Sequence, residues 1–312
     1  MLEFLKLVRL KNIAFAAFMM YATRYFVVLP LLERDGFLLQ VTEGQFSLLV
    51  VAVCCLVAAA YVINDYFDTK ADRISGSRGV IVGKTVGRRP AITLHSLLNG
   101  VAVVLAFYLG WQEGCWELGL VFLAVSVLLW YYSFRYKKCF VWGNLTAALL
   151  AALVPLNVLL FELPLLYAAY PEMPTGEVGM VFHRVLAFSG FLFLNMLAYE
   201  INKDIFTVKG DRDEDTITFP VRLGIPATRG IIAGLVGVSV AVLATVYFGM
   251  FFPSGAAGVY FLVMGIFYGL YLYLLFRKPG SRGGQLNCLR LILLLGMGFS
   301  VVLFYILKHG SV

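Results

Sequence analysis

Two clusters of aspartate carry most of the acidic chemistry of this chain, because seven of its eight aspartates fall within residues 65–72 and 204–215. The first cluster reads NDYFDTKAD, which spaces Asn64, Asp68 and Asp72 four residues apart. On a helix this spacing places three oxygen-bearing side chains on one face, and like charges so close repel unless a cation lies between them. Mg²⁺ suits such a set, because it prefers hard oxygen ligands and uses a few carboxylates together with phosphate oxygens and water.

The second cluster reads EINKDIFTVKGD and places Glu200, Lys203, Asp204, Thr207 and Asp211 on successive helical turns. Asp204, Thr207 and Asp211 follow the spacing i, i+3, i+7 and therefore share one face. Two acidic helix ends on the same side of one helical bundle predict facing metal sites, each holding one side of a diphosphate. Bound metal would take up charge on the leaving oxygens, so the pattern favours Mg²⁺-assisted departure of a diphosphate.

Basic side chains accompany both clusters. Residues 73–90 contain five Lys and Arg residues among glycines, Arg78 among them, and Lys203 and Lys209 stand within the second cluster. One interpretation is that some of these cations neutralise a diphosphate leaving group. The other is that residues 73–90 carry ordinary charges that anchor a cytoplasmic loop.

The elements that position these clusters are membrane-spanning helices. Hydrophobic residues make up 61% of the 312 residues and charged residues only 14%, whereas soluble domains average about 45–50% and 25%. Apolar stretches long enough to cross about 30 Å of hydrocarbon must be helical, since they lack the alternation of a barrel strand. The sequence predicts an all-α, polytopic membrane protein forming a single domain over residues 1–312. The nine expected spans are 10–31, 44–63, 91–110, 116–134, 140–163, 179–200, 226–249, 255–276 and 286–307.

The basic residues also predict the orientation of these spans. About 20 of the 25 Lys and Arg residues fall in the N-terminal tail and in the loops after the second, fourth, sixth and eighth spans. By the positive-inside rule, the N-terminus and both Asp-rich segments are cytoplasmic and the C-terminus lies outside. The net charge of +7 is thus a signal of topology and does not imply binding to nucleic acid.

Over most of its length, the sequence resembles the UbiA-type superfamily of intramembrane prenyltransferases. The resemblance rests on NDYFDTKAD, on EINKDIFTVKGD followed by TFPV, on YYSFRYKK followed by WGN, and on the N-terminal RLKN. It implies nine helices around a central cavity, in which both acidic motifs face each other under cytoplasmic cap loops.

The resemblance also implies roles for individual residues. Asn64, Asp68 and Asp72 would serve a first Mg²⁺ and Asp204 and Asp211 a second. The residues that would meet the diphosphate are Lys137, Arg135, Lys138, Lys203 and Arg78, and those that would line the cavity or bind the acceptor are Arg9, Asn12, Tyr132 and Asn144. One position departs from the family pattern, because Thr207 stands where a middle aspartate is common. A neutral hydroxyl is a weaker Mg²⁺ ligand, so a loosely held second metal, an altered substrate or an inactive protein remains open.

The function that these features predict is transfer of an isoprenoid chain from an allylic prenyl diphosphate to a lipophilic acceptor, with no obligatory protein partner. Within the family, NDYFD with its downstream aspartate and basic segment is most similar to the digeranylgeranylglyceryl phosphate synthase group, which favours a prenylglyceryl phosphate acceptor. An aromatic quinone precursor is the alternative. A transporter of a divalent cation or phosphorylated solute is a hypothesis of another class, although transporters usually place ionisable residues near the middle of the bilayer.

Overall fold

Helices form almost all of the chain in the computed structural model, which describes residues 2–69, 81–172, 175–213, 215–277 and 282–309. The first half of the chain forms α1 (Leu2–Leu7), α2 (Leu10–Thr23), the π-helical turn η1 (Arg24–Val28), α3 (Leu29–Arg34), α4 (Glu43–Phe67), α6 (Arg88–Gln112), α7 (Leu118–Phe134), the short turn η2 (Tyr136–Lys138) and α8 (Trp142–Ala169). The second half forms α9 (Thr175–Asp213), α10 (Phe219–Leu223), α11 (Ile225–Val246), the π-helical turn η3 (Tyr247–Phe251), α12 (Gly255–Phe276) and α13 (Arg282–His309).

The polytopic all-α class is confirmed, but the expected number of spans is not exact. Within the described ranges, seven helical segments are long and apolar enough to cross a membrane. The spans expected at 116–134 and 286–307 correspond to α7 and to the apolar stretch Gly283–Gly296 of α13, which are shorter. The 17 residues of α7 reach about 26 Å, less than the roughly 30 Å of a hydrocarbon core.

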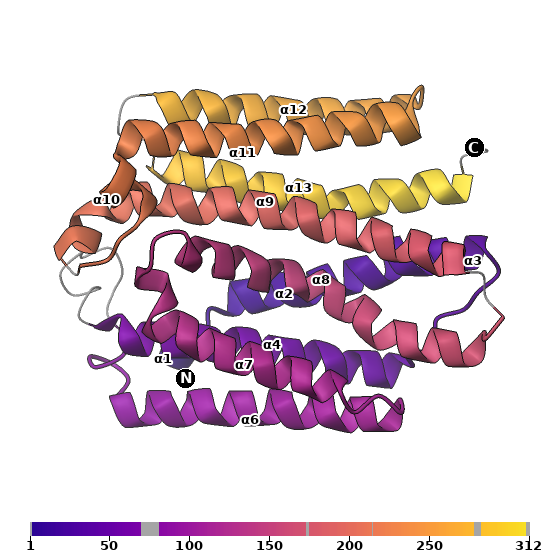
Figure 1. Cartoon of the computed structure of the whole chain (residues 1–312), viewed down its shortest axis with the longest axis horizontal. Coiled ribbons are helices and arrows are strands. Elements are labelled where there is room, and N and C mark those ends of the chain that lie inside the picture. Colours follow the sequence, from indigo (N-terminus) through magenta and orange to yellow (C-terminus); the bar gives the residue numbers. More distant parts are fainter. Residues whose placement is uncertain (1, 70–80, 173–174, 214, 278–281, 310–312) are drawn as a thin grey trace.

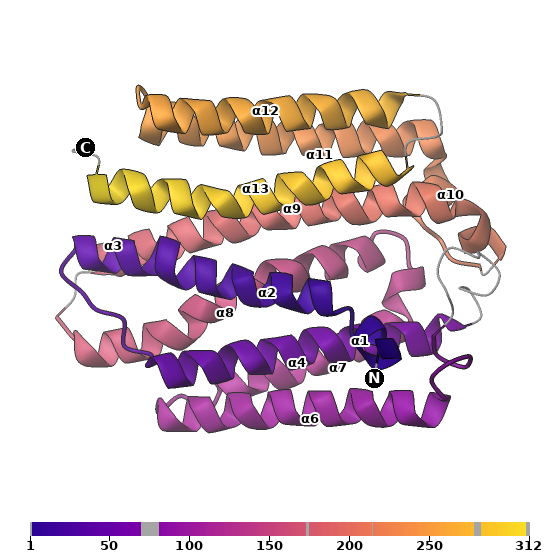
Figure 2. The ribbon, with the colours of Figure 1, turned by 180° about the vertical axis from the view of Figure 1, so that it is seen from behind.

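The long helices lie roughly side by side along the longest axis of the molecule (Figure 1). Seen from behind, α2 crosses between α4 and α13 (Figure 2). The helix α1 lies toward the end that carries α10, whereas the C-terminal end of α13 lies toward the opposite end (Figure 1). The N-terminal helix α1 and the C-terminal end of α13 therefore lie toward opposite ends of the bundle (Figure 1).

Helix α9 connects the two main hydrophobic clusters of the described core. Its first half contributes Val185 and Leu192 to a cluster built mainly on α2, α4 and α8. Its second half contributes Ala198 and Ile201 to a cluster with α11, α12 and α13. With 39 residues, α9 extends for about 58 Å, far more than the bilayer requires. Its last turns therefore project beyond the apolar core, and these turns carry the second acidic motif.

Candidate active site

The first acidic motif lies at the C-terminal end of α4, at the end of the bundle that carries α10 (Figure 1). Asn64 donates a hydrogen bond from Nδ2 to Asp68 Oδ2 at 2.8 Å, so these two side chains do converge. The helical face predicted for Asn64, Asp68 and Asp72 extends only to Asp68, because α4 ends at Phe67 and Asp68 is its C-terminal cap. Asp72 lies outside the described residues. A carboxylate at a helix C-terminus faces the negative end of the helix dipole, so Asp68 needs a cation beside it.

Lys137 supplies that cation. Its Nζ pairs with Asp68 Oδ1 and lies 3.5 Å from Asn64 Oδ1. The lysine belongs to the short turn η2, which follows α7 and precedes α8. A Cβ on Gly143 would lie 2.9 Å from Lys137 Cα, so only glycine lets the first turn of α8 pack this closely on η2. The WGN segment thus fixes the backbone that carries Lys137.

The second acidic motif lies on the last turns of α9. Asp204 is buried and accepts a hydrogen bond from Asn144 Nδ2 at 2.8 Å. Asp211 Oδ2 accepts hydrogen bonds from Thr207 Oγ1 at 3.0 Å and from Thr218 Oγ1 at 3.2 Å. The sequence prediction that Thr207 and Asp211 share a face is confirmed. In this arrangement the Thr207 hydroxyl orients the neighbouring carboxylate.

Backbone contacts tie η2 to the segment that follows α9. The Ile217 amide donates to the Lys138 carbonyl at 3.0 Å. The rings of Phe140 and Phe219 pack with their centroids 4.9 Å apart, and the Arg222 guanidinium lies over the Phe140 ring at 4.7 Å. The loop that carries Lys137 is therefore held against the loop that follows the second motif.

Tyr132, near the end of α7, lies between the two motifs. Its hydroxyl is within electrostatic range of Asp68 from the first motif and of Glu200, Lys203 and Asp204 from the second. Lys203 forms an ion pair with Glu200 one turn deeper in α9. These interactions, together with the Asn144–Asp204 hydrogen bond, place α4, α7, α8 and α9 around a single polar region.

Two further candidate residues contact the C-terminal end of α4. Arg9 Nη2 pairs with Asp65 Oδ1 at 2.7 Å, and its guanidinium lies 4.5 Å over the Tyr61 ring. Asn12 donates from Nδ2 to the Tyr61 hydroxyl at 2.8 Å. The structure thus places Arg9 and Asn12 against α4, within one helical turn of Asn64.

Not every sequence-predicted residue joins this region. The side chains of Arg135 and Lys138 are exposed, and Arg78 lies outside the described residues. Thr218 and Glu200 were not among the predicted site residues. Thr218 lies in TFPV, which gave no separate chemical signal. Glu200 was visible as an acidic residue close to an apolar span, and that is the signal that could have identified it.

The donor atoms of both motifs fit Mg²⁺. Among the described residues, no three His, Cys, Asp or Glu side chains are close enough to hold a metal ion by themselves. Each motif does offer hard oxygen atoms, from Asn64 and Asp68 on one side and from Asp204 and Asp211 on the other. Mg²⁺ commonly binds through one or two carboxylates and completes its shell with phosphate oxygens and water. A Mg²⁺ ion shared with a diphosphate therefore needs only a few protein ligands, and each motif offers that many.

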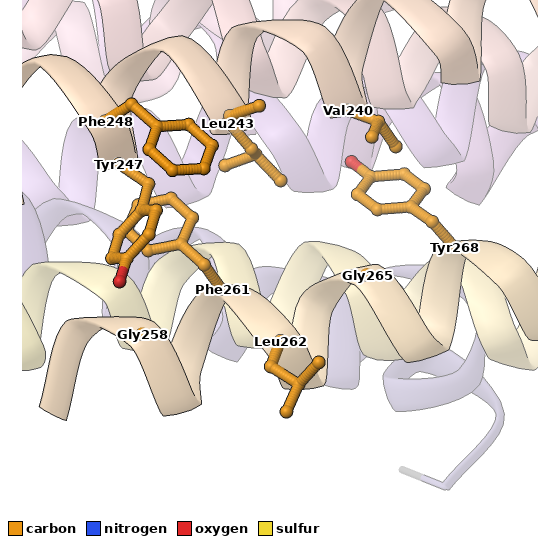
Figure 3. A pocket seen from close by; sticks show the side chains of 10 residues that line it. Val240, Leu243, Tyr247, Phe248, Gly258, Phe261, Leu262, Gly265 and Tyr268 are labelled. Atoms are coloured by element: carbon orange, nitrogen blue, oxygen red, sulfur yellow. The ribbon is translucent and has the colours of Figure 1, made fainter. Parts of the chain in front are cut away.

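A separate groove of about 300 Å³ lies between α11 and α12. Figure 3 shows the rings of Tyr247, Phe248 and Phe261 at one end of it and Tyr268 toward the other. The Tyr268 hydroxyl donates to Asn195 Oδ1 of α9 at 2.7 Å. None of the residues that the structure describes along this groove is charged, so it offers no partner for a diphosphate.

Comparison with known proteins gives one consistent result. Residues 14–285 match the model of the UbiA prenyltransferase family. Digeranylgeranylglyceryl phosphate synthase from Methanothermobacter thermautotrophicus is 31% identical over 231 residues, covering 73% of this chain and 69% of that protein. A solved structure of a digeranylgeranylglyceryl phosphate synthase has a TM-score of 0.66 at 19% identity, with 97% of both chains covered. A UbiA homolog from Archaeoglobus fulgidus bound to GPP and Mg²⁺ has a TM-score of 0.62 at 15% identity, covering 97% of this chain and 99% of that one.

A multi-pass helical bundle with two acidic motifs at one end defines a class of intramembrane enzymes. This chain belongs to the UbiA prenyltransferase family and is a prenyltransferase. This family membership supports the enzyme hypothesis over the transporter hypothesis.

Proposed function

We propose that this protein moves an isoprenoid chain from an allylic prenyl diphosphate to a prenylglyceryl phosphate, in a Mg²⁺-dependent reaction within a single domain. The observation that carries the proposal is the convergence of the first motif, Lys137 and the second motif at one end of the bundle. The acceptor class rests on the similarity to digeranylgeranylglyceryl phosphate synthases. No feature of the site favours an aromatic acceptor over this one.

The proposed donor site has two sides. Asn64 and Asp68, and by its place in the sequence motif Asp72, would hold Mg²⁺ on the first side, and Asp204 and Asp211 would hold it on the second. When bound, the metal neutralises charge on the departing diphosphate. Lys137 and Lys203 stand beside these carboxylates and would bind diphosphate oxygens. Arg135 and Lys138, exposed beside Lys137, are further candidate cations. Arg78 stays a candidate from the sequence alone.

The proposed acceptor side lies deeper and toward α2. Asn144 holds the Asp204 carboxylate in place, while Tyr132 lines the space between the motifs. Arg9 and Asn12 border this space through Tyr61 of α4. Aromatic walls suit this role, because ring faces stabilise positive charge on an allylic carbon after diphosphate departs.

The orientation is part of the proposal. The chain is a multi-pass membrane protein, and the excess of Lys and Arg in the loops at the acidic end places that end and the N-terminus in the cytoplasm. The C-terminus would then lie outside. A fluorescent protein fused after Val312 should be exported unfolded and remain dark, whereas alkaline phosphatase fused there should fold outside and be active. The reverse pattern would place the Asp-rich end outside.

The activity test uses purified protein in lipid vesicles with Mg²⁺, radiolabelled geranylgeranyl diphosphate and geranylgeranylglyceryl phosphate. The expected product is a labelled ether lipid, formed with release of diphosphate. Asp68→Asn and Asp211→Asn should each abolish both signals, whereas the matched control Asp35→Asn, at the far end of α3, should not. A parallel reaction offers 4-hydroxybenzoate in place of the glyceryl phosphate. Transfer of the label to 4-hydroxybenzoate, with none to the glyceryl phosphate, would identify an aromatic acceptor and contradict the proposed one.

A further inference from the structure

Glu200 is a described acidic side chain close to both motifs that the proposed metal sites do not use. It lies four residues before Asp204 on α9, which places it about 6 Å deeper in the bundle. Its side chain is only 13% exposed. An ionisable group carried this far into a spanning helix is costly and is usually kept for a function.

The surroundings of Glu200 belong to the site and not to the lipid. Its charge acts on the hydroxyl of Tyr61 from α4 and on that of Tyr132 from α7. On α9 itself, its charge acts on Asp204, and its carboxylate pairs with Lys203. Glu200 therefore faces the interior between α4 and α7, on the bilayer side of the two motifs.

The proposed reaction needs a proton acceptor in this place. The bond from C1 of the donor to the diphosphate oxygen breaks, and its electron pair leaves with the diphosphate. The acceptor oxygen then bonds to C1, while its O–H bond breaks and leaves that electron pair on the new ether oxygen. The released proton must pass to a base within hydrogen-bond reach, and such a base contributes roughly 10²–10⁴-fold to the rate.

The carboxylates of the motifs are poorly suited to take this proton. Asp68 is paired with Lys137, Asp204 accepts from Asn144, and Asp211 accepts from two threonine hydroxyls. Coordination to Mg²⁺ would occupy these oxygens further. Glu200 is assigned to neither metal site, and among the described residues its carboxylate pairs with Lys203, whose ammonium is a mobile point charge on a flexible stem.

We infer that Glu200 is the catalytic base that takes the proton from the acceptor hydroxyl. This inference rests on the proposed function. Binding of the donor draws the Lys203 ammonium toward the diphosphate and frees the Glu200 carboxylate for the acceptor. After the ether has formed, Glu200 passes the proton to water as the products leave.

The test separates donor cleavage from ether formation in Glu200→Gln, which keeps the size of the side chain and an oxygen for Lys203. The donor carries ¹⁸O at its bridging position, and movement of this label to a nonbridging position reports cleavage of the C1–O bond even when no ether forms. We expect Glu200→Gln to keep this exchange and to bind donor within about threefold of wild type, while ether formation falls roughly 10²–10⁴-fold. Glu200→Asp should recover part of the rate.

Glu117→Gln, an exposed carboxylate at the far end of α7, is the matched control and should form ether at the wild-type rate. Wild-type ether formation by Glu200→Gln would overturn the inference alone. So would a parallel loss of isotope exchange and ether formation, because Glu200 would then support the donor or the fold. If the wild-type protein exchanges the label but makes no ether with the glyceryl phosphate, the proposed function fails and the role of Glu200 fails with it.

Discussion

Substitution of Gly143 by alanine tests whether the close packing of α8 on η2 positions Lys137. The new Cβ would lie 2.9 Å from Lys137 Cα and 3.0 Å from the Tyr136 carbonyl oxygen. Carbon atoms in contact normally lie about 3.5–4.0 Å apart, so the η2 backbone must move by roughly 0.6–1.1 Å. A shift of about 1 Å in a positioning group costs on the order of 10²-fold in rate, and overpacking costs about 1–3 kcal/mol in stability.

The assay compares diphosphate release and melting temperature between Gly143→Ala and wild type at saturating Mg²⁺. Gly234→Ala on α11 is the matched control, because no heavy atom lies within 4 Å of its added Cβ. This control should keep its activity and gain up to about 1 kcal/mol in helix stability. A Lys137→Met background should remove most of the effect of Gly143→Ala on rate. The reasoning would be refuted if Gly143→Ala released diphosphate at the wild-type rate. It would also be refuted if Gly143→Ala lowered the rate by the same factor in the Lys137→Met background as in the wild-type protein.

Three further predictions concern other parts of the chain. Arg24→Met should lower the free energy of unfolding by about 3–5 kcal/mol, because it leaves Glu162, only 1% exposed, without its ion-pair partner. Arg34→Met, at an exposed arginine, is the control and should change the melting temperature little. Glu113 lies just beyond α6, and burial, with a smaller effect of the Glu162 charge, raises the pKa of its carboxyl to about 7. The folded state therefore favours the protonated carboxyl, and stability falls as pH rises from about 4.5 through 7. Glu113→Gln should accordingly raise the melting temperature at pH 8 and not at pH 4, and equal gains at both would contradict this. Thr207→Asp adds a carboxylate beside Asp211 and should enlarge the rise in melting temperature caused by Mg²⁺, whereas an unchanged rise would place residue 207 outside the metal shell.

The sequence predicted the local part of the site well. The Asn64–Asp68 and Thr207–Asp211 contacts both join residues four positions apart on one helix, which helical periodicity alone determines. The positions of the long spans followed from hydropathy, because a bilayer demands about 20 apolar residues for each crossing. The span expected at 179–200 covers only part of α9, and the helix continues through the second motif to Asp213, in keeping with the helical spacing of that motif.

The contacts between distant residues could not be predicted from spacing. Lys137 pairs with Asp68 across 69 positions, and Asn144 binds Asp204 across 60. The first depends on how η2 lies against the end of α4, the second on how α8 packs against α9, and the tight junction at Gly143 joins η2 to α8. The buried pair of Arg24 and Glu162 was missed for the same reason, since each charge alone looks like an error within an apolar span. Only tertiary packing supplies the partner that makes such a charge tolerable.

The central claim is that the acidic ends of α4 and α9 form one diphosphate site. It is tested most directly by a double-mutant cycle on donor affinity, with Asp68→Asn and Asp204→Asn singly and together, measured by titration of geranylgeranyl diphosphate with and without Mg²⁺. One shared site predicts Mg²⁺-dependent binding, a large loss in each single variant, and little further loss in the double variant. Donor binding that is independent of Mg²⁺, or two small losses that simply add, would contradict the claim.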